Sequence, residues 1–175
     1  VSTLGFDASF VFTTIYSKMN SAVLIAIPLF IILGAIMEKG GVGSALVNFV
    51  EIFTGRIKGA LCMVGTVACA VFGAICGSGA ATLSCIGSIM APKMRERKYP
   101  MGVAAAVLAC AAPIGMLIPP SSIQILFAWA GNLSVLTCFM ATVIPGIILT
   151  SLISVCGIVM CKKYPDVVVT KKISA

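Results

Sequence analysis

Residues 59–92 read GALCMVGTVACAVFGAICGSGAATLSCIGSIMAP and contain no charged side chain. A helix that crosses a bilayer needs about 20 apolar residues, so the stretch is too long for one crossing and too short for two crossings with a turn. Gly77-Ser78-Gly79 lies near its centre, where small residues favour a turn. The stretch therefore predicts a re-entrant helical hairpin: a helix to about Ile75, a tip at Cys76–Gly79, and a helix back to Pro92.

The composition of the whole chain places this hairpin in a membrane protein. Of the 175 residues, 60% are hydrophobic and 10% are charged. A soluble domain has roughly 45–50% apolar and about 25% charged residues. A second stretch, residues 99–161, is also free of charge, and no segment shows the period of two that is typical of a strand. We therefore expect an all-α polytopic membrane protein.

The basic residues cluster between the apolar segments. One cluster precedes the hairpin and another follows it; together they contain Lys39, Arg56, Lys58, Lys93, Arg95, Arg97 and Lys98. A hairpin returns the chain to the side that it left, so both clusters lie on one side, as the positive-inside bias of cytoplasmic loops prefers. The formal net charge of +7 is therefore interpreted as a sign of membrane topology and not of nucleic-acid binding.

The segments on either side of the hairpin complete the predicted layout. Pro28 and Gly34 are expected to interrupt the first spanning helix, and Pro145-Gly146 is expected to be an irregularity in the last one. The chain is expected to be a piece of something longer. We expect a scaffold part at 1–58, with a spanning helix at 21–37 and an interfacial amphipathic helix at 42–53. A transport region at 59–130 follows, made of the hairpin 59–92 and the broken helix 102–130. A transmembrane helix is expected at 135–161, and residues 162–175 are expected to be a cytoplasmic tail or a linker to a missing second half.

Residues 102–130 are long enough to span but contain Pro113, Gly115, Pro119 and Pro120 near their centre. Proline lacks the amide donor and clashes with the preceding turn, so the helix must break there. Broken helices survive in lipid only where protein or a water-filled cavity surrounds them, and they mark the midplane site of transporters. We therefore expect the hairpin tip and this break to meet.

The chemistry of such a site follows from its opened turns. Unwound carbonyls can hold Na⁺, and the N-termini of half-helices present amide hydrogens to an anion. Neither uncharged stretch contains the carboxylate or His that a proton relay needs, which favours coupling to Na⁺ over coupling to H⁺. Hydroxyl groups near the two breaks come from Ser78, Thr82, Ser84, Ser121 and Ser122.

Three runs, IPLFIILGAIMEKGGV, GAICGSGAATLSCIGSIMAPKM and APIGMLIPPSSIQI, closely resemble the large membrane subunit of TRAP transporters, the DctM-like family. The likeness extends from about Ala26 to Tyr164. It implies an ion-transporter superfamily fold with two inverted repeats, of which this chain resembles the first. It further implies Na⁺-driven, elevator-type import of organic anions such as C4-dicarboxylates or sialic acid across the bacterial inner membrane. The implied partners are a small four-helix membrane subunit and a periplasmic substrate-binding protein.

The resemblance also implies site residues, matched position by position. No cofactor or metal beyond the coupling Na⁺ is expected. Where the family usually has Thr or Ser before the Ile/Leu-Gly of its broken helix, this chain has Pro113, so one hydroxyl ligand is lost. The implied sodium-binding residues are Gly77, Ser78, Gly79, Ala80, Ile114, Gly115 and Met116, and the implied substrate-binding residues are Ser78, Pro119, Pro120 and Ser121.

Two alternatives to a transporter remain at this point. One is a channel or a structural membrane subunit, which the sequence does not exclude. The other is an intramembrane serine protease, suggested by Cys76-Gly77-Ser78-Gly79. A protease needs a base to activate its serine, and the chain has no His and no Lys within its apolar segments, which disfavours this alternative.

Overall fold

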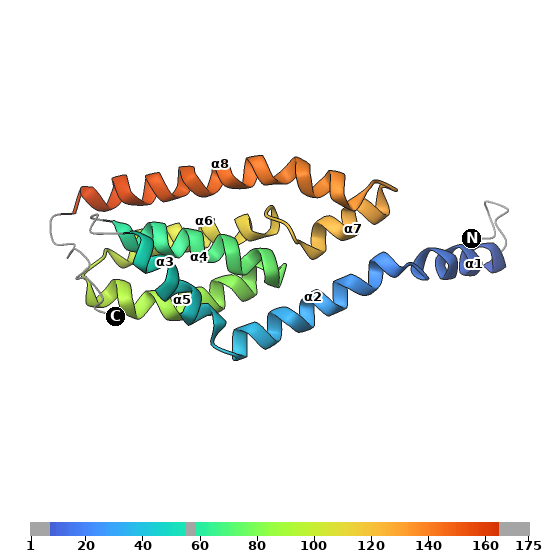
Figure 1. Cartoon of the computed structure of the whole chain (residues 1–175), viewed down its shortest axis with the longest axis horizontal. Helices are drawn as coiled ribbons and strands as arrows, with labels where there is room; N and C mark the ends of the chain where they lie inside the picture. The colour runs from blue at the N-terminus through green and yellow to red at the C-terminus, as the bar shows by residue number, and fades with distance from the viewer. Residues whose placement is uncertain (1–7, 55–58, 165–175) are drawn as a thin grey trace.

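The computed structural model describes residues 8–54 and 59–164, and over these residues it contains helices and connecting turns but no strand (Figure 1). The expected basic residues Arg56 and Lys58 and most of the expected tail lie outside the described residues. The elements in chain order are α1 (Ala8–Met19), α2 (Ala22–Lys39), α3 (Val42–Thr54), α4 (Ala60–Cys76), α5 (Gly79–Glu96), α6 (Met101–Ala111), the 3₁₀ helix η2 (Ala112–Met116), α7 (Ser122–Ala130) and α8 (Val135–Lys162).

Helix α4 is the centre of the molecule. It packs against α3, α5, α6, η2 and α8 (Figure 1). Most of its side chains are buried. Small residues allow these close approaches; a Cβ built on Gly65, for example, would lie 2.8 Å from Cδ2 of Leu108 on α6. The core around α4 consists mainly of Leu61, Cys62, Val64, Cys69, Phe72, Ile86, Met90, Met94, Val107 and Leu108.

The hairpin consists of α4 and α5, which lie side by side and are joined by Gly77 and Ser78. The turn is shorter than the expected tip at 76–79, because Cys76 ends α4 and Gly79 begins α5. Helix α5 also continues past Pro92 to Glu96. A proline inside a helix removes one amide donor but need not end the helix. Whether the hairpin enters the membrane and returns stays a prediction.

The expected interruption at Pro28 and Gly34 is wrong, because α2 runs through both residues as a continuous helix. Helix α8 also continues through Pro145-Gly146 without a break. A single proline kinks a helix without unwinding it. The nearby glycines are contact residues. A Cβ on Gly34 would lie 3.0 Å from Cα of Cys76, and a Cβ on Gly146 would lie 3.0 Å from Cγ1 of Ile118. These glycines bring α2 close to the hairpin tip and α8 close to the broken helix.

Length and hydropathy pick out one unbroken helix among the described residues, α8, that could cross a membrane. Helices α1 and α2 pass the same test only as a bent pair. The shorter apolar helices are α3, α4 and the continuous run of α6 with η2. Such short helices fit a re-entrant hairpin, which traverses only part of a bilayer, and the half-helices of a broken span.

Helix α3 is amphipathic, as its sequence pattern predicts. Its buried residues recur at helical spacing and face α4 and α5: Gly43, Val47, Glu51 and Thr54. On its other side Phe49 and Phe53 are exposed, with ring centroids 5.0 Å apart in an edge-to-face arrangement. An exposed apolar face of this kind suits a membrane surface, although the interfacial position of α3 stays a prediction.

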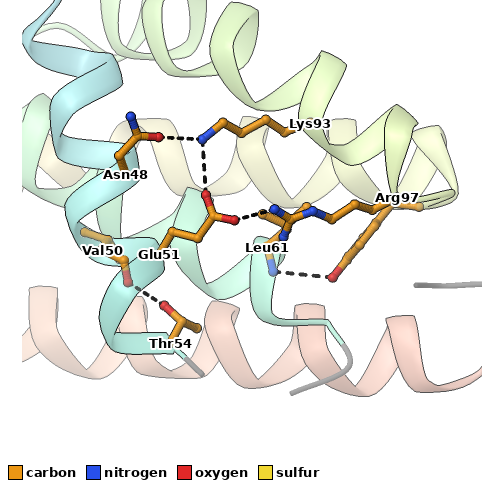
Figure 2. A network of polar contacts seen from close by, with 8 residues as sticks. Asn48, Val50, Glu51, Thr54, Leu61, Lys93 and Arg97 are labelled. Carbon is orange, nitrogen blue, oxygen red and sulfur yellow. Dashed lines mark hydrogen bonds and ion pairs between the residues drawn. The ribbon is translucent and has the colours of Figure 1, made fainter. Parts of the chain in front are cut away.

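Glu51 ties α3 to the C-terminal end of the hairpin (Figure 2). Its carboxylate accepts hydrogen bonds from Lys93, at 3.1 Å, and from Arg97, and its side chain is only 3% exposed. Lys93 also donates to Oδ1 of Asn48 at 2.7 Å. Burial by itself raises the pKa of Glu51, but the hydrogen bonds and positive charges of Arg97 and Lys93 outweigh it and lower the pKa below its ordinary value.

We expect Glu51→Gln to loosen α3 from the hairpin by about 1–2 kcal/mol, because the amide keeps the shape but leaves two cations without their counter-charge. A group with a lowered pKa in the folded state stabilises above its ordinary pKa and loses that effect as pH falls through the lowered value. Hydrogen exchange of the α3 amides should therefore quicken in the variant at neutral pH, and the difference should fade as the pH falls through the lowered pKa of Glu51.

The exposed carboxylate of Glu38 supplies the control, since Glu38→Gln removes the same charge without removing an ion pair that the structure records. Equal protection of α3 in Glu51→Gln and in the unmodified protein at neutral pH would contradict the role assigned to this contact.

Candidate functional site

The two breaks meet at a crossing of backbones. Gly73, one turn before the hairpin tip, lies against Gly115 in η2. A Cβ built on Gly73 would lie 2.9 Å from Cα of Gly115, and one built on Gly115 would collide with Cα of Gly73. No side chain larger than hydrogen fits at either position, so the main chains of α4 and η2 are in direct contact. The expectation that tip and break meet is confirmed.

The tip itself contacts the start of α7. Gly77 adopts a left-handed backbone, with φ of 64°, which only glycine adopts without strain. A Cβ on Gly77 would also collide with Oγ of Ser122, the first residue of α7. On the other side of the tip, a Cβ on Gly79 would lie 3.1 Å from Cε of Met116. The glycines of the tip thus allow the hairpin to fit between η2 and α7.

Ser78 begins α5 as its N-cap. Its hydroxyl accepts a hydrogen bond from the amide of Ala81 at 3.4 Å, and its carbonyl accepts one from the hydroxyl of Thr82 at 2.8 Å. Thr82 is fully buried, and a Cβ on Gly73 would lie 3.1 Å from its Oγ1. The hydroxyl of Thr82 therefore lies beside the crossing. The exposed Pro113 supplies no hydroxyl there.

The break leaves carbonyl oxygens open. Helix α6 passes into η2, and residues 117–121 then run without helix to Ser121, the N-cap of α7. Two of the carbonyls accept turn bonds, that of Ile114 from Leu117 and that of Gly115 from Ile118. Within the described part of the chain, no backbone amide donates to the carbonyls of residues 117–120. These neutral oxygens are the type of ligand that Na⁺ takes from unwound backbone.

Two buried side-chain oxygens near the break also have no partner. Ser121 is fully buried and Gln124 is 8% exposed, yet Oγ of Ser121 and Oε1 of Gln124 form no hydrogen bond with any described residue. The amide nitrogen of Gln124 donates to the carbonyl of Met116 at 2.8 Å, which ties α7 to η2. Buried polar atoms are nearly always paired, so two unpaired acceptors here indicate a place for a water, an ion or a ligand.

A cavity of about 370 Å³ opens beside the tip and is closed on one side by α2. Its polar lining includes Ser78 and Ser122, together with Glu38 from the end of α2. Glu38 is a carboxylate next to the predicted cation site, whereas the sequence suggested that only neutral oxygens are available there. Nothing in the sequence indicates that the end of α2 reaches the tip.

The structure brings most of the predicted site residues together but not all of them. Gly77, Ser78, Gly79, Gly115 and Met116 lie at the tip and the crossing. Ala80, Ser84 and Pro120 are exposed, and the structure records no contact between them and the crossing. Ile114 is buried, Pro119 is half-buried, and Ser121 is buried with its free hydroxyl oxygen. The residues that the sequence reasoning missed are Gly73, Glu38 and Gln124.

The chain is apolar and all-α, and its hairpin tip contacts an interrupted helix that has unpaired oxygens. This arrangement is typical of secondary transporters of the membrane. Residues 4–171 match the model of the family described as "Tripartite ATP-independent periplasmic transporter, DctM component". The chain belongs to this family, whose members are permeases of the bacterial inner membrane and not enzymes. The protease alternative is therefore set aside.

Curated relatives agree with the family. The chain is 39% identical over 126 residues to the C4-dicarboxylate TRAP transporter large permease protein DctM of Pseudomonas aeruginosa, covering 72% of this chain and 30% of the relative. It is 36% identical over 136 residues to the ectoine/5-hydroxyectoine TRAP transporter large permease protein UehC of Ruegeria pomeroyi, covering 78% and 32%. It is 32% identical over 144 residues to the 2,3-diketo-L-gulonate TRAP transporter large permease protein YiaN of Escherichia coli, covering 82% and 34%. The chain spans about a third of each relative.

We expect Gly115→Ala to separate η2 from α4, because the added methyl group collides with the backbone of Gly73 and backbone cannot move aside as a side chain can. Overpacking of this kind costs about 1–3 kcal/mol. The apparent melting temperature of the purified protein should fall. Gly102→Ala is the matched control, because a Cβ on Gly102 meets nothing within 4 Å. If the two variants melt alike, the backbone crossing is not as close as described.

Proposed function

We propose that this chain carries an ion-binding site of a TRAP-type permease that imports an organic anion together with Na⁺. The contact between the hairpin and the broken helix carries the proposal, because it brings the hydroxyl of Thr82 on the hairpin beside the unwound segment, where the side-chain oxygens of Ser121 and Gln124 have no partner among the described residues. Following the family resemblance, the hairpin and broken helix would move as an elevator against a scaffold that includes α2. The molecule would work with a small membrane subunit and a periplasmic substrate-binding protein.

The cation would be held mainly by neutral oxygens. Candidate ligands are the hydroxyl of Ser78, backbone carbonyls of the break, and the hydroxyl of Thr82 in place of the one missing at Pro113. The carboxylate of Glu38 in the adjoining cavity would raise the local concentration of cations without being a required ligand, since it is exposed. Gln124 would act as a positioning residue by fixing the carbonyl of Met116.

The anion would be attracted by two helix N-termini. Helices α5 and α7 both begin at the site, and the contact between Gly77 and Ser122 shows that these two ends adjoin. The positive ends of helix dipoles and their free amides favour a carboxylate. Ser78, Pro119, Pro120 and Ser121 stay the candidate substrate contacts. The relatives are named for different substrates, so we propose no particular acid.

We expect Ser78→Ala to raise the Na⁺ concentration for half-maximal uptake about fivefold to tenfold. This change corresponds to the loss of one neutral ligand that contributes about 1–1.4 kcal/mol to binding. Uptake by the natural full-length protein, reconstituted in proteoliposomes with its partners, is the measurement. Ser84→Ala is the matched control, because Ser84 is an exposed hydroxyl on the same helix. Unchanged sodium dependence in Ser78→Ala would remove Ser78 from the site.

The re-entrant topology has its own test, with single cysteines in a background without native cysteines. Lys39→Cys precedes the hairpin and Glu96→Cys follows it, so both should react with an impermeant maleimide only from the cytoplasmic side. Ser134→Cys, in the turn before α8, should react only from the periplasmic side. Reaction of Lys39→Cys and Glu96→Cys from opposite sides would contradict the re-entrant hairpin.

A further inference from the structure

An apolar trough runs between α5 and α6, away from the candidate site. It encloses about 310 Å³, within the range of about 300–1,000 Å³ that ligand pockets occupy. Leu83 and Met101 at its border are exposed, so the trough opens on the outer surface. Most of its lining residues are glycine or alanine, whose small side chains leave room for the hollow. It is lined by Leu83, Gly87, Ala91, Met101, Ala104, Ala105, Leu108 and Ala109.

A second hollow, of about 380 Å³, adjoins the trough at the C-terminal end of α5. Ala91 lines both, and Pro92 continues the apolar surface. The other two lining residues are Arg95 and Glu96. One continuous surface therefore begins with hydrocarbon side chains and ends with one cation and one anion.

Arg95 and Glu96 are free to bind a ligand. Both are exposed, and neither forms a side-chain hydrogen bond or ion pair with another described residue. The neighbouring Lys93 and Arg97 are engaged by Glu51 of α3 (Figure 2). The basic end of α5 is expected at the cytoplasmic surface of the membrane, the level of the lipid headgroups.

We propose that this surface binds a phosphatidylethanolamine molecule. An acyl chain lies in the α5–α6 trough, the phosphate binds Arg95, and the ammonium group binds Glu96. A guanidinium matches two phosphate oxygens at once, and an ammonium donates three hydrogen bonds, which a carboxylate accepts.

The paired charges select this headgroup over the other common ones. Phosphatidylcholine carries the same charges but has no N–H group to donate to Glu96. Phosphatidylglycerol carries no cation and would bring its negative charge near Glu96. A trough without Glu96 would prefer the anionic lipid, because the loop 93–98 is otherwise basic.

The headgroup test compares three lipids with identical acyl chains on the natural full-length protein. Lipid retained after detergent purification is counted by native mass spectrometry. Phosphatidylethanolamine should be retained roughly tenfold more than the other two, the effect of one charge-assisted hydrogen bond. Arg95→Gln should lower its retention by a similar factor, and Glu96→Gln should remove its preference over phosphatidylglycerol.

The trough is tested by filling it. A Cβ on Gly87 meets only Cδ1 of Leu83, at 3.8 Å, so Gly87→Leu fits and occupies the space of the acyl chain. Gly102→Leu is the matched control on α6, outside the trough, where a Cβ meets nothing within 4 Å. Gly87→Leu should lower lipid retention severalfold and Gly102→Leu should not, while both variants keep the melting temperature of the unmodified protein.

Three results would overturn the proposal. The first is equal retention of all three lipids, which marks an unselective lipid annulus. The second is undiminished retention in both Arg95→Gln and Gly87→Leu. The third is the absence of retained lipid together with protection of Ala105→Cys from maleimide, which means that another part of the full-length protein covers the trough.

Discussion

Backbone amides and carbonyls need partners wherever water is absent, and this requirement governs the arrangement of the whole chain. A segment can leave the helical conformation inside a membrane only where other protein closes around it. The contact of Gly73 with Gly115 provides that closure, since it lets η2 approach α4 without an intervening side chain. The small residues of α4 extend the same close packing to α3, α5, α6 and α8.

Local chemistry explains which parts of this structure could be predicted from the sequence. The hairpin and the break at 113–121 follow from the length of the uncharged stretches and from adjacent prolines. The continuity of α2 and α8 could not be predicted, because one proline weakens a helix by an amount that neighbouring helices can offset. The positions of Glu38 and Gln124 near the site could not be predicted for another reason. They depend on which distant helix end reaches the tip, and no local sequence pattern carries that information.

The candidate site uses only a part of the length of a TRAP-type permease. Its proposed ligands come from a hairpin tip, a short 3₁₀ helix and the start of α7, and the chain spans about a third of its relatives. The side-chain oxygens of Ser121 and Gln124 are buried and have no hydrogen-bond partner among residues 8–54 and 59–164. A water, an ion or a ligand at this place would pair both oxygens.

Helix α3 joins the two ends of the hairpin. Helix α2 passes the hairpin tip, where Gly34 lies against Cys76, and the chain then turns at Gly41, whose φ is 72°. Helix α3 runs from this turn to the other end of the hairpin, where Glu51 pairs with Arg97. The number of residues from Gly41 to Glu51 therefore sets the direction in which the Glu51 side chain leaves the helix. One inserted residue would rotate Glu51 by about 100° about the helix axis and swing its carboxylate away from Lys93 and Arg97. Evolution can change the side chains of this segment far more easily than its length.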